Sequence, residues 1–265
     1  MSKPRTYQTE AIIIRKTKLK EADRILTLLT MDYGKIRVVA KGVRHLKSRM
    51  AGHLELLTHS QINLARGRNL DTIIGAQTIS SFLPLKCDLE LSAYGLYMLE
   101  LTDQFTPEEQ ENKAGFELLR DSLHVLCSAR DRDLLLHYFE VHLLQASGYR
   151  PQLHQCVSCL APLAPVTNYF SAHAGGMLCP ACREKQTVAY PVSTDTLRVL
   201  QLLQDNIYET VCGLKLSRSL NYYIQGVMRD YISFILEREL RSVDWLRTLK
   251  REPYPVSNPA EAKVE

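Results

Sequence analysis

Short apolar segments with β-branched or alternating side chains fill the first third of the chain. They lie at 11–15, 24–31, 36–40, 54–65 and 70–80, and turn residues separate them. In the turn at 32–35, Gly34 supplies the positive φ that tight turns often need, and 66–69 is typical of a hairpin tip. Five short strands within about 70 residues indicate a small barrel or a sandwich. We expect a five-stranded barrel of the oligonucleotide-binding type.

Beyond Pro84 the apolar positions recur at helical spacing. The segments with this pattern are 89–105, 113–128, 133–147, 193–211 and 217–246. Thr106, followed by a proline and two acidic residues, has the composition of a helix start. The apolar stripes favour a helical core over a groove for a partner peptide.

These patterns predict an α+β protein of more than one domain. We expect a nucleic-acid-binding barrel over 1–82 and a helical domain over 83–250, followed by a mobile tail over 251–265. A composition of 45% hydrophobic and 23% charged residues suits a globular protein with a sizeable core. The first ten residues are polar and no apolar run approaches the about 18 residues of a membrane span, which predicts a cytoplasmic protein.

Charge is unevenly distributed along the chain. The stretch 15–49 carries a formal charge of +8, whereas the whole chain carries +4. Together with two arginines at the hairpin tip, its basic residues are the candidate nucleic-acid ligands: Arg15, Lys16, Lys18, Lys20, Arg24, Lys35, Arg37, Lys41, Arg44, Lys47, Arg49, Arg66 and Arg68. Such a block is typical either of a solvated surface or of a polyanion-binding face, and its strong sign bias favours the second.

The predicted strands would place several of these basic residues on one side of the barrel. Strand neighbours two apart share a side, so Lys35, Arg37 and Lys41 should face outward together. Tyr7 and Tyr33 are the only aromatic residues among the first 80, which leaves little surface for stacking bases. Binding should therefore act through phosphates, with little sequence preference and a steep dependence on salt.

Two CxxC motifs stand between the helical segments. Cys156 and Cys159 form the first, and Cys179 and Cys182 form the second, nineteen residues later. Two such knuckles supply four thiolates for one tetrahedral Zn²⁺, a closed and therefore structural site. The segment 153–186 has little core of its own, so metal binding would supply its folding energy. Paired disulfides and an iron–sulfur cluster remain alternatives, the former disfavoured by a reducing compartment.

The sequence favours no catalytic function. It contains no glycine-rich phosphate loop, no Ser–His constellation and no carboxylate cluster typical of nucleases. Two other functions compete with a general nucleic-acid binder. One is a zinc-stapled regulator that reads a specific DNA sequence, and the other is a scaffold whose basic face binds an acidic protein.

Several longer motifs together resemble one family. They are TEAIIIR at 9–15, KEADRILTLLT at 20–30, GKIRVVAKGVR at 34–44, KSR at 47–49, GYRP at 148–151, CVSC at 156–159 and GGMLCPAC at 175–182. The combination is similar to the RecO family of bacterial recombination mediators and covers nearly the whole chain except the C-terminal tail.

The resemblance implies an oligonucleotide-binding barrel, a helical domain and an inserted zinc hairpin. It further implies a non-enzymatic, nucleoid-associated protein that binds single- and double-stranded DNA and anneals complementary strands. With RecR, and often RecF, such proteins help load RecA onto DNA coated by single-strand-binding protein. The family contacts RecR and the C-terminal tail of single-strand-binding protein. Some members lack the four cysteines, so zinc rests here on the spacing of this sequence.

Overall fold

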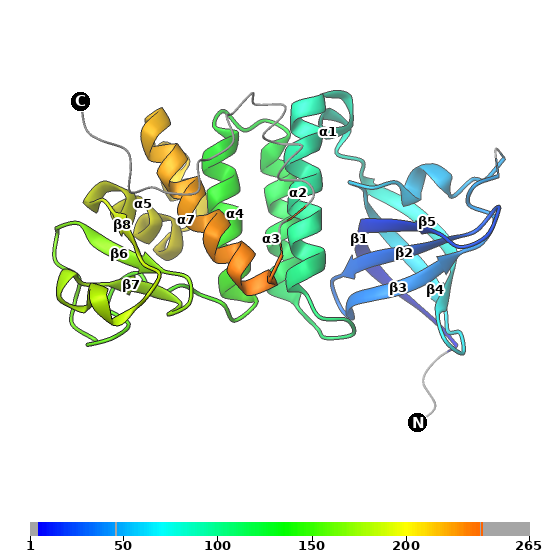
Figure 1. The fold of residues 1–265 in the computed structure, drawn as a ribbon. Coiled ribbons are helices and arrows are strands. Elements are labelled where there is room, and N and C mark those ends of the chain that lie inside the picture. Colours follow the sequence, from blue (N-terminus) through cyan, green and yellow to red (C-terminus); the bar gives the residue numbers. More distant parts are fainter. Residues whose placement is uncertain (1–4, 46, 239, 241–265) are drawn as a thin grey trace. The chain divides into compact units, whose positions relative to one another are not determined.

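The computed structural model describes residues 5–45, 47–238 and 240. The chain forms two compact units, 1–129 and 130–265, each containing strands and helices (Figure 1). Residues 83–129 thus belong to the same compact unit as the barrel. A domain boundary at residue 82 stays a prediction.

Five strands of the first unit close into a barrel in the order β1-β2-β3-β5-β4, which confirms the expected fold class. The strands are β1 (Thr6–Lys18), β2 (Arg24–Thr30), β3 (Gly34–Ala40), β4 (His59–Ala65) and β5 (Asp71–Ser80). Strand β1 is longer than its apolar run because its first half pairs with β4 and its second half with β2. The barrel closes where β3 and β5 run parallel, at Val38 and Val39.

Alternation along the strands fills the barrel. Ile13, Leu26, Val38 and Ile62 point inward into one core and are fully buried, whereas Arg37 on β3 is exposed. The short 3-10 helix η1 (Ala51–Leu54) adds Leu54 to this core. This segment was expected to begin a strand, but β4 begins only at His59.

The barrel's unit also holds α1 (Leu83–Cys87), α2 (Leu89–Phe105) and α3 (Lys113–Leu126). The predicted helix start at Thr106 is wrong: this residue caps the C-terminus of α2, where its N–H donates to the carbonyl of Thr102. Helix α3 starts after Asn112, whose side chain accepts a hydrogen bond from the N–H of Gly115 at 2.8 Å. The predicted helical segment 113–128 therefore begins where expected, and Thr106 shows that a capping side chain alone does not mark a helix start.

The second unit combines helices with a small sheet. Its elements are α4 (Arg132–Ala146), β6 (Asn168–Ser171), β7 (Gly176–Leu178), the 3-10 helix η2 (Pro180–Lys185), β8 (Tyr190–Val192), α5 (Thr194–Asp205), α6 (Tyr208–Val211) and α7 (Arg218–Leu236). The sheet order β7-β6-β8 contains the expected hairpin and adds a third strand that the sequence did not suggest.

Two helices of this unit differ from the predicted ones. The single helix expected over 193–211 is divided between α5 and α6, since Asn206 and Ile207 are extended. Helix α7 ends at Leu236, where Glu237 turns into the left-handed region with φ +53°. Residues 241–246 of the predicted helix and the predicted tail at 251–265 lie outside the described residues.

A buried polar network joins α4 to α7 in this unit. His137 lies 2.8 Å from the side-chain oxygen of Asn221 and 3.3 Å from the carboxylate of Glu140, and Asn221 in turn donates to Asp133. Since these groups satisfy one another, they fix the register of the two helices. None of the helices in the described part of the chain has the length and hydropathy needed to cross a membrane.

Candidate nucleic-acid interface and metal centre

The strand register gathers most of the basic block at one end of the barrel. Lys18 at the end of β1 pairs with Arg24 at the start of β2, which pairs with Ala40 at the end of β3. The loop after β3 is tied to the same end, because the N–H of Arg44 donates to the carbonyl of Ala22. Residues distant in sequence thus form one cationic region, which we call the basic end. Its exposed members are Lys18, Lys20, Lys41, Arg44, Lys47 and Arg49.

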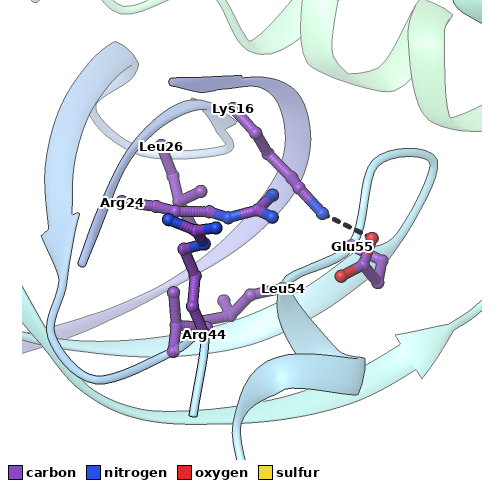
Figure 2. A pocket seen from close by; sticks show the side chains of 7 residues that line it. Lys16, Arg24, Leu26, Arg44, Leu54 and Glu55 are labelled. Carbon is purple, nitrogen blue, oxygen red and sulfur yellow. Dashed lines mark hydrogen bonds and ion pairs between the residues drawn. The ribbon is translucent and has the colours of Figure 1, made fainter. Parts of the chain in front are cut away.

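A small pocket lies at the basic end. It has a volume of about 130 Å³ and is lined by Lys16, Arg24, Leu26, Val43, Arg44, Leu54 and Glu55. Figure 2 shows the guanidinium groups of Arg24 and Arg44 close together, with Lys16 and Glu55 facing each other beside them. The ammonium group of Lys16 forms an ion pair with Glu55. Glu55 was not singled out from the sequence, since a lone acidic residue outside the basic block carried no signal.

Lys35 requires a correction. Its side chain is buried, and its ammonium group binds the backbone carbonyl and the carboxylate of Asp103 in α2, the latter at 3.2 Å. The alternation was right, since Lys35 does point out of the barrel, but α2 covers this end of β3. We therefore remove Lys35 from the candidate interface, while Arg37 and Lys41 stay exposed as expected.

Arg15 forms an ion pair within the first unit and also remains half exposed to solvent. Its guanidinium group lies 3.3 Å from the carboxylate of Asp103, yet half of its side chain, 51%, is exposed. Arg15 and Lys35 thus share one buried carboxylate, which connects β1, β3 and α2 within the first unit.

Arg66 and Arg68 are exposed on the turn between β4 and β5. The guanidinium of Arg66 lies 4.6 Å from the ring centre of Tyr7, and this ring packs edge-on against Tyr33 at 4.7 Å. Burial and the hydrogen bond to Asp71 raise the pKa of Tyr7. Tyr7 and Tyr33 are therefore both engaged in packing within the barrel's unit.

Lys86 was missed by the sequence reasoning because it lies in the short helix α1, far from the basic block. Its ammonium group donates to the hydroxyl of Thr58 at 2.6 Å, and burial lowers its pKa. The charges of Glu55 and Lys16 also act on this group, which places Lys86 near the pocket.

The four predicted cysteines come together in the second unit. The sulfur atoms of Cys156, Cys159, Cys179 and Cys182 all lie within 4.8 Å of one another, close enough to bind one metal ion. Each motif curls back on itself: the N–H of Leu160 donates to the carbonyl of Cys156, and that of Cys182 to the carbonyl of Cys179. The first knuckle is docked on β7, where the N–H of Val157 donates to the carbonyl of Met177 at 2.9 Å, and the second knuckle follows β7 directly.

The thiols are held in an environment suited to cations. Burial would raise the pKa of Cys156, but hydrogen bonds from the backbone N–H groups of Cys179, Cys159 and Ser158 lower it to about 6. Burial and hydrogen bonds with the other three thiols raise the pKa of Cys179 to about 11. Thiols that share one site resist full deprotonation until a cation neutralises them.

Fold and site together define a class of protein: an oligonucleotide-binding-type barrel with a basic end, joined in one chain to a helical unit with a four-cysteine metal site. Residues 1–82 match the family described as "Recombination protein O N terminal", and residues 87–244 match "Recombination protein O C terminal". The chain belongs to the RecO family of DNA repair proteins.

Curated relatives agree over nearly the full length. A protein named "DNA repair protein RecO" from Dehalococcoides mccartyi (strain CBDB1) is 46% identical over 250 residues, which cover 94% of this chain and 98% of that protein. Proteins of the same name from Roseiflexus sp. (strain RS-1) and Symbiobacterium thermophilum are 42% and 35% identical. These matches cover 97% and 92% of this chain, and 90% and 98% of those proteins.

Proposed function

We propose that this protein is a non-enzymatic mediator of DNA recombination that binds single- and double-stranded DNA through phosphates, at the basic end of the barrel and at Arg37, which is exposed on β3. The observation that carries the proposal is the gathering of exposed cations from the end of β1, the turn after it and the loop after β3 on one surface. Neutralising phosphates lowers the repulsion between two strands. The same surface would therefore anneal complementary strands as well as bind one.

Membership of the RecO family supports the wider role. We propose that the protein acts with RecR, and with RecF, to load RecA onto DNA coated by single-strand-binding protein, whose C-terminal tail it would contact. Such a role places it in the bacterial cytoplasm, associated with the nucleoid.

We further propose that the metal of the cysteine site is a single structural Zn²⁺. With Zn–S bonds of about 2.3 Å, a regular tetrahedron places sulfur atoms about 3.8 Å apart. The sulfur atoms of Cys159 and Cys179 are 3.8 Å apart. Four thiolates fill the tetrahedron, so the ion would stabilise the hairpin and activate no water.

The test is fluorescence anisotropy on labelled single strands of two unrelated sequences, titrated across salt. For about five phosphate contacts, the slope of log affinity against log salt should be near −3.5 for both. In an Arg37→Ala/Lys41→Ala variant, the slope should flatten by about 1.4, two contacts' worth. Arg198→Ala, at an exposed position of α5 in the second unit, should leave the slope unchanged.

Equal steep slopes for both sequences support the proposal. A strong preference for one sequence would instead support a sequence-specific regulator, which reads base edges. Absence of binding at low salt would contradict the proposed DNA interface and leave the basic end to a protein partner.

A further inference from the structure

The pocket at the basic end has features that binding along a strand does not require. A strand's backbone can be neutralised by cations on an open surface. Here Lys16, Arg24 and Arg44 line a concave space together with Leu26 and Leu54, which are essentially fully buried (Figure 2). The exposed part of the lining is therefore mainly charged.

The charges of the pocket are incompletely balanced. Lys16, whose side chain is only 12% exposed, is paired with Glu55. Within the described residues, neither Arg24 nor Arg44 has a carboxylate within 4.0 Å. One nitrogen of Arg44 donates to a neutral acceptor, the carbonyl of Glu21, at 2.8 Å. Three cations and one carboxylate leave the lining with a net charge of +2.

The size of the pocket selects a small group. At about 130 Å³ it is well below the roughly 300–1,000 Å³ typical of pockets for drug-sized ligands. It has room for an oxyanion and excludes a whole nucleotide. Two guanidinium groups offer paired N–H donors, which suit the oxygens of a phosphate better than an isolated ammonium does.

Charge selects the kind of phosphate. A phosphodiester inside a strand carries one negative charge and continues on both sides, so it fits a small concave pocket less well than a terminal group does. A phosphate monoester carries about −1.5 to −2 at neutral pH and presents three acceptor oxygens. That charge matches the +2 of the lining, and a monoester occurs where a strand ends.

We propose that this pocket binds the terminal phosphate monoester of a DNA strand, so that the protein distinguishes phosphorylated strand ends from hydroxyl ends. The inference rests on the proposed DNA binding and extends it. Phosphates along the strand contact the exposed cations of the basic end, and the terminal phosphate enters between Arg24 and Arg44. Glu55 positions the ammonium of Lys16 at the rim.

The experiment compares single strands of one sequence that carry a 5′-phosphate, a 3′-phosphate or hydroxyls at both ends, with the label placed internally. Anisotropy at one salt concentration should give about tenfold tighter binding of a phosphorylated strand, the effect expected of added charge-assisted hydrogen bonds. The 5′ and 3′ arms show which end enters the pocket.

Two variants separate the pocket from the surrounding surface. Arg24→Gln should bring the phosphorylated and hydroxyl strands to equal affinity. Arg37→Gln, the matched change on the open face of β3, should weaken all strands by a similar factor and preserve the ratio between them. Preservation of the ratio in Arg24→Gln, or its loss in Arg37→Gln, would overturn the assignment.

The outcomes also separate this inference from the proposed function. Equal binding of phosphorylated and hydroxyl strands by the unaltered protein overturns the pocket assignment and leaves DNA binding intact. Failure to bind any of the strands contradicts the proposed function itself. Displacement of a phosphorylated strand by a peptide ending in acidic residues, with no preference among the strands, would assign the pocket to a carboxylate and overturn the phosphate assignment.

Discussion

Removing the carboxylate of Asp103 should destabilise the first unit more than any surface substitution. Asp103 is buried in α2 and is approached by Lys35 at 3.2 Å and Arg15 at 3.3 Å. The ammonium of Lys35 is also buried, with 9% of the side chain exposed. An Asp103→Ala change leaves that ammonium a backbone carbonyl to bind but no opposite charge.

The expected cost follows from burial. Removing one partner of a buried ion pair costs about 3–5 kcal/mol, because the remaining charge is neither hydrated nor neutralised. Lys35→Met should cost less, about 1–3 kcal/mol, since Arg15 still neutralises the carboxylate. The two variants should therefore differ, with Asp103→Ala the more destabilised.

Urea unfolding followed by circular dichroism measures both free energies. With an m-value of about 2 kcal/mol/M, Asp103→Ala should lower the midpoint by about 1.5–2.5 M. Arg37→Ala, at an exposed position on the same strand as Lys35, should change stability by less than about 0.5 kcal/mol. In a Lys35→Met/Asp103→Leu variant, apolar packing replaces both charges, and much of the lost stability should return.

Two results would refute this reasoning. One is a cost below about 1 kcal/mol for Asp103→Ala, a value typical of an exposed ion pair. The other is a salt dependence of DNA binding that flattens in Lys35→Met as much as in Arg37→Ala. The ammonium of Lys35 would then be available to phosphates, and its removal from the interface would be wrong.

Three further predictions concern the metal site, the turn before β3 and the buried histidine. Cys159→Ser should abolish the bound zinc, measured by elemental analysis. It should also raise hydrogen exchange in the β6–β7 hairpin, while the barrel stays protected. Cys212→Ser, at an exposed cysteine outside the cluster, should change neither the zinc content nor the exchange. Gly34→Ala should lower the urea midpoint strongly, since φ is +64° and the new Cβ would lie 1.8 Å from a backbone oxygen, whereas Gly52→Ala meets nothing within 4 Å and should be tolerated. Burial alone would lower the pKa of His137, but its carboxylate and amide neighbours raise it above its ordinary 6.5. The stability it contributes is therefore complete below that ordinary value and lost as pH rises through the raised pKa, so melting temperatures across this range should fall less in His137→Gln than in the unaltered protein.

The sequence was sufficient for the features that depend on local pattern. Alternation of apolar residues predicted the five strands, since one face of each strand had to fill the barrel. The spacing of Cys156, Cys159, Cys179 and Cys182 predicted a cluster because each CxxC motif folds as a local knuckle. Both features were confirmed.

The sequence did not predict which side chains are buried by contact with an element distant in the chain. Nothing local distinguishes Lys35 from Arg37, which alternate on one strand, and only α2 makes the first a buried partner of Asp103. Glu55 and Lys86 escaped notice for the same reason, since their roles arise from contacts with distant segments. The start of α3 at Lys113 was expected, whereas the false helix start at Thr106 arose because a capping side chain, a proline and two acidic residues occur there without a helix.

The covered and uncovered surfaces of the barrel also decide how a nucleic acid could approach it. His59 of β4 packs against Phe116 of α3, and Lys35 of β3 is held by α2, so the helices of this unit occupy the surface there. The exposed cations lie at the ends of β1 and β3 and in the following loop, where no described helix of the unit covers them. A strand that runs over these cations passes the rim of the pocket formed by Arg24 and Arg44. Binding along a strand and recognition of its terminal phosphate would therefore use one continuous surface. Substitutions on this surface can weaken both, so the two are distinguished by the ratio of the affinities for phosphorylated and hydroxyl-ended strands, and not by either affinity alone.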